Sequence, residues 1–151
     1  MHGPSGLELW LGEAKFYTDR DVAVRDAITS LRAHFKTDYL RGEFALVTDK
    51  IDSSWKHAHE VRRLIHENAP IQEVFSRVTV PVLLAYDSPA VGSHTQVTAQ
   101  FISDFKSEMN EGFKRFATSY DGSLPVKVRL FLAPLASKRQ LITELERRLP
   151  G

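Results

Sequence analysis

The chain has 151 residues, of which 42% are hydrophobic and 26% charged, a balance typical of one folded domain and not of a disordered chain. Without cysteine it forms neither disulfides nor thiolate metal sites, and no apolar run reaches the roughly 18 residues of a membrane span. The net charge is only +1, so binding to nucleic acid would have to rest on a local basic patch. The absence of a signal-peptide pattern predicts a cytoplasmic protein.

The first predicted element is a strand over residues 7–17, in which Glu13 and Lys15 follow a hydrophobic run. Because side chains alternate along a strand, Glu13 and Lys15 project from the same face. Apolar residues on both faces predict that the strand is covered on both sides, where a charge without a partner costs roughly several kcal/mol. The two side chains therefore need each other, a metal ion or a phosphate.

The rest of the chain alternates between helical and extended patterns, and the proline at position 81 predicts a place near a strand start or at a sheet edge. The alternation predicts an α/β fold, with a small mixed β-sheet flanked by helices, in a single domain over residues 1–151. Because the chain opens almost directly in a core strand, we expect this domain to lack its N-terminal part. The remaining predicted elements are helices over 19–36, 38–51, 55–67 and 71–77, a strand over 78–86, a loop over 87–93, a helix over 95–120, a strand over 125–133 and a helix over 138–149.

A Glu-x-Lys sequence at the C-terminal end of a buried strand, directly before a helix, has two interpretations. In the first, Glu13 holds Mg²⁺ for phosphodiester hydrolysis, and Lys15 orients a water or stabilises developing negative charge. In the second, the two residues form a salt bridge at the strand end. Asp87, directly after the second strand, has a similar choice between a ligand site and a turn or cap.

Basic residues gather on two predicted surfaces, one on a helix and one on the last strand. Either surface could contact nucleic-acid phosphates, and either could be an ordinary solvated face. These residues are Lys56, His59 and Arg63 on the helix and Lys127 and Arg129 on the strand.

Residues 9–17, with the sequence Leu-Trp-Leu-Gly-Glu-Ala-Lys-Phe-Tyr, together with residues 26–31 in the following helix, resemble the C-terminal domain of the HamA family. The strand over 80–87 fits the same pattern. HamA nucleases are partners of a helicase in the Hachiman anti-phage defence system, and their domain resembles the PD-(D/E)xK restriction-endonuclease-like fold. The resemblance therefore implies a nuclease-like domain.

The resemblance also implies roles for individual residues. Glu13 matches the metal-binding glutamate and Lys15 the catalytic lysine, with Mg²⁺ (or Mn²⁺) as the metal, DNA as the substrate and a HamB-like helicase subunit as the partner. The family's metal-binding aspartate lies upstream on the preceding strand, whereas this chain has no aspartate before Asp19, and His2 and Glu8 are the polar candidates there. The alternative is a non-catalytic interaction module, or a truncated remnant, that docks onto the helicase.

Overall fold

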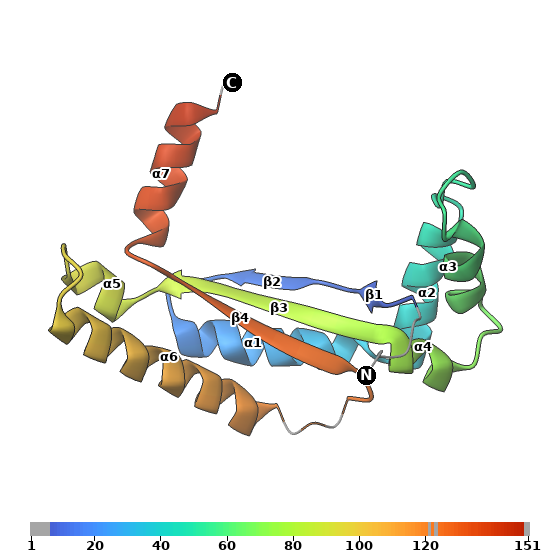
Figure 1. Ribbon diagram of the computed structural model, residues 1–151, viewed down its shortest axis with the longest axis horizontal. Coiled ribbons are helices and arrows are strands. Elements are labelled where there is room, and N and C mark those ends of the chain that lie inside the picture. The colour runs from blue at the N-terminus through green and yellow to red at the C-terminus, as the bar shows by residue number, and fades with distance from the viewer. Residues whose placement is uncertain (1–6, 121, 123, 150–151) are drawn as a thin grey trace. The chain divides into compact units, whose positions relative to one another are not determined.

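The computed structural model describes residues 7–120 (without the side chains of Thr37 and Asp38), 122 and 124–149, and it shows an α/β protein (Figure 1). The predicted α/β class, with a small sheet flanked by helices, is confirmed. No helix in the described part of the chain is long and apolar enough to cross a membrane. In chain order the elements are β1 (Leu9–Trp10), β2 (Glu13–Phe16), α1 (Arg20–His34), α2 (Thr37–Thr48), α3 (Ala58–Leu64), α4 (Ile71–Arg77), β3 (Val78–Asp87), α5 (Pro89–Ser93), α6 (Ala99–Ser119), β4 (Lys127–Leu135) and α7 (Lys138–Arg148).

The first strand is divided, and its two parts share one register against the neighbouring strand. Leu9 of β1 lies opposite Val78 of β3, and Glu13 of β2 lies opposite Val82, both in parallel pairs. β1 and β2 are thus two parts of the single strand that the sequence predicts over residues 7–17. β4 pairs with β3 as well, which makes β3 a central strand of the four-stranded sheet.

The division has a local cause in Pro81. The N–H of Leu11 donates to the carbonyl of Thr79 at 3.1 Å. The next bond of a parallel ladder would be donated by residue 81, and proline has no N–H. Pro81 is the fourth residue of the ten-residue β3, so it lies in the first half of the strand, as one of the two expected places required. β3 is not an edge strand, so the other expected place, at an edge, is wrong.

The chain forms two compact units. Two of the boundaries between them lie between residues 12 and 13 and between residues 81 and 82, close to the point where the first strand is divided. The first unit comprises residues up to 12, 30–81 and 122–129, with α2, α3 and α4. The second comprises 13–29, 82–121 and from 130 onward, with β2, α5, α6 and α7. Helix α1 and strands β3 and β4 contribute residues to both.

Each unit has an apolar core built from helix and strand faces at the spacing that the sequence predicts. Burying these side chains contributes about 1.5–3 kcal/mol each for the larger ones. The first core contains Leu31, Phe35, Leu40, Phe44, Ile51, Leu64, Ile65, Val74, Phe75, Val78 and Val80, and the second contains Ala23, Val24, Ala27, Ile28, Val82, Leu84, Tyr86, Ala90 and Phe116.

One face of the first strand is open, contrary to the expectation that both are covered. In the first unit, Trp10 is 51% exposed, and in the second unit Phe16 is 37% exposed. Instead of a helix, a cation lies over each ring: the guanidinium of Arg129 is 5.4 Å from the centre of Trp10, and the ammonium of Lys138 is 4.8 Å from the centre of Phe16.

The segment predicted as a loop over residues 87–93 contains a short helix, α5. The hydroxyl of Ser88 accepts from the N–H of Val91 at 3.0 Å and caps the helix start, and Pro89 occupies its first turn. A helix of this length leaves no periodic apolar pattern, which is why the sequence does not reveal it.

Candidate active site

Glu13 and Lys15 form the ion pair that their spacing allows. Lys15 Nζ lies 2.9 Å from Glu13 Oε1, and the two side chains are 23% and 12% exposed, respectively. The strand register places them beside Val82 and Leu84, which are fully buried. The pair therefore lies on the largely covered face of β2, where each charge is stabilised by the other. The hydrogen bond with Glu13 raises the pKa of Lys15, so this side chain is an ammonium at neutral pH.

Two more residues extend this pair. Tyr17 follows on the same alternating face, and its hydroxyl donates to Asp26 Oδ2 on helix α1 at 2.8 Å. That bond is the main cause that holds the pKa of Asp26 below its usual value, and the negative charge of Asp26 also acts on Lys15. We refer to Glu13, Lys15, Tyr17 and Asp26 as the Glu13 cluster.

The sequence alone did not indicate Tyr17 or Asp26 as site residues. The direction of Tyr17 follows from the two-residue period of the strand, so its place beside Lys15 was predictable. The place of Asp26 depends on how α1 packs, because the buried Ala23 and Ala27 fix the rotation of the helix. The helix start is in turn fixed by Asp19, whose Oδ1 accepts from the N–H of Val22 at 2.8 Å.

The upstream polar residues do not join this cluster. Glu8 belongs to the first unit and accepts a hydrogen bond from the hydroxyl of the buried Thr79. That bond is the main cause that lowers the pKa of Glu8. His2 lies outside the described residues.

The five predicted DNA-contacting residues all lie in the first unit, whereas Glu13 and Lys15 lie in the second. All five are exposed, as a phosphate-binding residue must be. Helix α3 begins at Ala58, so Lys56 precedes the helix and only His59 and Arg63 share the predicted helical surface. Arg63 is 3.7 Å from Glu73, and Arg129 lies over the ring of Trp10, so both cations already have partners. Lys127 is the other exposed cation of this set on β4.

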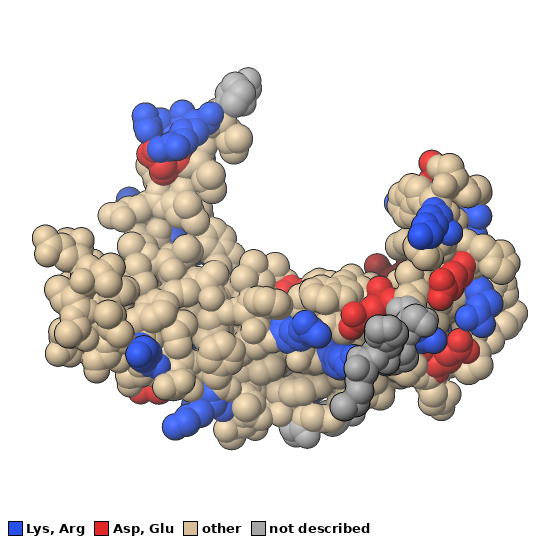
Figure 2. Space-filling model, in the orientation of Figure 1, with Lys and Arg blue, Asp and Glu red and all other residues tan. Residues whose placement is uncertain are grey.

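Figure 2 shows a basic group on α7, with an acidic side chain beside it. In that helix Arg147 and Arg148 both pair with Glu144 at 2.7 Å. This pairing lowers the net positive charge that the two arginines offer to a nucleic-acid phosphate.

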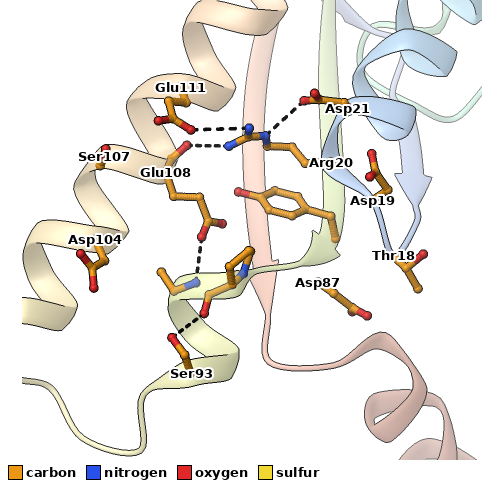
Figure 3. Close-up of a pocket in the computed structure, with 13 residues that line it drawn as sticks. Thr18, Asp19, Arg20, Asp21, Asp87, Ser93, Asp104, Ser107, Glu108 and Glu111 are labelled. Atoms are coloured by element: carbon orange, nitrogen blue, oxygen red, sulfur yellow. Dashed lines mark hydrogen bonds and ion pairs between the residues drawn. The ribbon is translucent and has the colours of Figure 1, made fainter.

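The second unit also contains a pocket of about 610 Å³ whose lining is strongly acidic (Figure 3). Arg20 reaches from α1 toward α6, where it donates to the carbonyl of Glu108 at 3.1 Å and lies 3.7 Å from the carboxylate of Glu111. Glu108 Oε2 accepts from the hydroxyl of Ser88 at 2.9 Å and from the N–H of Ala90 at 3.0 Å. We call this the acidic pocket; its ionisable lining residues are Asp19, Arg20, Asp21, Tyr86, Asp87, Asp104, Glu108 and Glu111.

The acidic pocket is unsuited to a phosphodiester, because its carboxylates far outnumber its single guanidinium. Asp87 lines it, but Asp87 Oδ1 accepts from the N–H of Lys138 at the start of α7. The structure thus favours the capping interpretation of Asp87 over the ligand interpretation. Glu13, Lys15 and Asp26 do not line this pocket.

The donor set of the Glu13 cluster fits one mode of magnesium binding and not another. Among the described residues, no three Asp, Glu or His side chains converge to hold a metal ion. Mg²⁺ usually keeps several waters and is bound by one or two carboxylates together with substrate phosphates. Glu13 offers hard carboxylate oxygens of this type, so it fits an ion that is held jointly with the substrate.

A sequence model of the HamA family matches residues 2–149, nearly the whole chain. The chain belongs to the HamA family. This membership points to a component of the Hachiman anti-phage defence system, as the resemblance of residues 9–17 implied. The chain has no significant match among curated proteins or among solved structures.

Proposed function

We propose that this HamA chain is a nuclease domain that hydrolyses DNA phosphodiesters with Mg²⁺ or Mn²⁺. The observation that supports the proposal is the Glu13–Lys15 ion pair on a largely covered strand face, at 2.9 Å. Because partial burial of an ion pair costs desolvation energy, the pair contributes little net stability, which supports a role in chemistry. Family membership adds the defence context in which DNA is the expected target.

Glu13 and Lys15 would have different roles, because their charges are opposite. Glu13 would hold the metal ion, whose chemistry there is to polarise a phosphate and to acidify a water. Lys15, with its raised pKa, keeps its proton at neutral pH and so acts as a donor, not as a base. It would orient the attacking water or stabilise the negative charge that develops on the phosphate oxygens.

The test is cleavage of supercoiled and linear DNA by the full chain, with and without Mg²⁺ or Mn²⁺. We expect metal-dependent cleavage that falls at least about 100-fold in Glu13→Gln and in Lys15→Met. Glu43→Gln and Lys106→Met are the matched controls, because both residues are exposed on helices outside the cluster. Metal-independent cleavage, or full activity in Glu13→Gln and Lys15→Met, would overturn the proposal.

A second candidate function is a non-catalytic module that docks onto a helicase subunit. The observation that favours it is helix α7, which has no buried residue and exposes Leu141, Ile142 and Leu145 by 39, 37 and 48%. Apolar helix faces of this kind commonly mark a protein contact. Co-purification with the helicase encoded beside this chain, lost in Leu145→Glu and without any DNA cleavage, would support this function. Failure to co-purify would count against it.

A further inference from the structure

The acidic pocket combines the volume of a small-molecule site with an excess of negative charge, and all of its lining lies in the second unit. Its volume of about 610 Å³ is within the range of roughly 300–1,000 Å³ that ligand pockets occupy. Six carboxylates line it, and Arg20 supplies the guanidinium that faces them. A lining of this charge attracts cations and repels anions.

The carboxylates of the acidic pocket lie on two sides of it. Figure 3 shows Asp104, Glu108 and Glu111 on helix α6 at one side. They are spaced by four and three positions, so they share one face of the helix. On the other side, Asp19 and Asp21 lie at the start of α1. An ion with one charged group neutralises one side, whereas two ammonium groups joined by a flexible chain can serve both.

Two buried acceptor atoms of the acidic pocket lack a hydrogen-bond partner among the described residues. Tyr86 is fully buried, and its hydroxyl is one of them. Glu108 uses Oε2 to accept from Ser88 and Ala90, whereas its buried Oε1 is the other. Buried polar atoms nearly always have partners, so each exception calls for a bound group that satisfies it. Both atoms can accept a hydrogen bond from a donor that enters the pocket.

A third atom of this kind, Arg20 Nε, also lines the acidic pocket. It lies 3.5 Å from Asp21 Oδ1, so its charge has an opposite charge beside it. In the part of the chain that the structure describes, the buried side-chain polar atoms without a hydrogen-bond partner are these three. Their concentration in one pocket favours an occupant, and the two atoms without a nearby opposite charge, on Tyr86 and Glu108, require a donor.

A primary ammonium group has the chemistry that these two atoms require. It carries three N–H donors and a positive charge, and with a pKa of about 10 it stays protonated at neutral pH. A metal ion fits less well, because no three Asp, Glu or His side chains within the described ranges converge to hold one. We propose that the acidic pocket binds a small organic diamine or polyamine, one of whose ammonium groups donates to Glu108 Oε1 and to the phenol oxygen of Tyr86. The pocket shares no residue with the Glu13 cluster, so this inference is independent of the proposed nuclease function.

The experiment measures the binding of hexamethylenediamine to the full chain by isothermal titration calorimetry. At neutral pH and about 0.15 M salt, association with exposed charges is screened. We expect saturable binding of one diamine per chain. Hexamethonium has the same chain length and charge but no N–H donor, so it should bind at least about tenfold more weakly. If the diamine does not bind saturably, or if both ligands bind equally well, the inference fails.

Two variants test the two acceptor atoms. Glu108→Gln keeps an oxygen for the bonds from Ser88 and Ala90 but replaces Oε1 with an amide nitrogen, and it should weaken diamine binding at least about tenfold. Tyr86→Phe should weaken it about three- to tenfold. Glu146→Gln, an exposed acid of α7 outside the pocket, is the control for net charge and should bind like the wild type. Wild-type affinity in either pocket variant would overturn the inference, and Tyr86→Phe decides alone if Glu108→Gln does not fold.

Discussion

The Glu13 cluster and the acidic pocket both place carboxylates beside one cation, yet their carboxylates have different partners. In the acidic pocket, Glu108 accepts from the N–H of Ala90 at the start of α5, and Asp87 accepts from the N–H of Lys138 at the start of α7. Both carboxylates therefore satisfy helix ends. In the Glu13 cluster, Glu13 pairs with the side chain of Lys15, and Asp26 accepts from the side chains of Tyr17 and Arg25.

The partners of a carboxylate therefore separate structural acids from candidate catalytic ones. A carboxylate that caps a helix cannot take up a metal ion without leaving a backbone N–H unsatisfied, which costs about 1–3 kcal/mol. A carboxylate whose partners are side chains can change partners without leaving a backbone N–H unsatisfied. The number of acids in the acidic pocket is therefore weak evidence for chemistry, since Glu108 and Asp87 are held by helix starts.

We expect the largest change in the free energy of unfolding from the loss of Glu108. Glu108→Ala removes the bonds from Ser88 and Ala90 and should lower the free energy of unfolding by about 2–3 kcal/mol, measured by urea denaturation. Cleavage per folded molecule should stay unchanged. Glu111→Ala, one turn away and 65% exposed, is the control and should cost at most about 1 kcal/mol. Loss of cleavage in folded Glu108→Ala would move the active site into the acidic pocket.

We expect the next largest change in the free energy of unfolding from breaking the Glu13–Lys15 ion pair. Lys15→Met removes the ammonium that faces a carboxylate only 12% exposed, and it should destabilise the fold by about 1–3 kcal/mol. Glu13→Gln/Lys15→Met should recover much of that loss, because no charge is then left on the covered face. The two single variants and the double variant, compared by urea denaturation, form the cycle. Additive losses would show that Glu13 and Lys15 do not depend on each other.

The sequence predicted the parts of the fold that depend on local periodicity. It placed Glu13 and Lys15 on one face, and α4 falls where helix 71–77 was expected. It did not predict the open face at Trp10, because an apolar alternation does not show whether a second layer exists. Asp26 was missed for a related reason, since the rotation of α1 against the strand is decided by tertiary packing.

The contribution of the acidic pocket to stability should depend on pH in the alkaline range, through Tyr86. Tyr86 in the acidic pocket is fully buried, and burial first and the charge of Glu108 second raise its pKa above the usual 10.0. The folded state favours the protonated phenol. The stabilisation of the fold by Tyr86 is therefore complete below pH 10 and is lost as the pH rises further. The free energy of unfolding should therefore fall less steeply above pH 10 in Tyr86→Phe than in the wild type.

The control for this measurement is Ile28→Val, a substitution of a buried residue in the same unit that changes no titratable group. It should keep the alkaline slope of the wild type. Lys15, whose pKa is also raised, titrates at high pH in all three proteins and so drops out of the comparison. An unchanged slope in Tyr86→Phe would mean that the phenol of Tyr86 is not shielded from water.

The smallest effect tests the link between Tyr17 and Asp26 directly. The hydrogen bond from Tyr17 is the main cause that holds the pKa of Asp26 below the usual 3.8, and the bond from Arg25 lowers it less. Because its pKa is lowered, the ionised Asp26 stabilises the fold fully above pH 3.8, and this stabilisation is lost as the pH falls below that value. Tyr17→Phe should therefore raise the pKa of Asp26, followed by carboxyl NMR, and flatten the acid loss of stability.

Arg25→Gln is the matched comparison, because Arg25 contacts the same carboxylate from the solvent side. It should raise the pKa of Asp26 less than Tyr17→Phe does. If Arg25→Gln has the larger effect, Asp26 is governed by its exposed neighbour and not by the strand, and the Glu13 cluster reduces to a single ion pair. If Tyr17→Phe has the larger effect, Asp26 belongs electrostatically to the strand face that carries Lys15 and Tyr17.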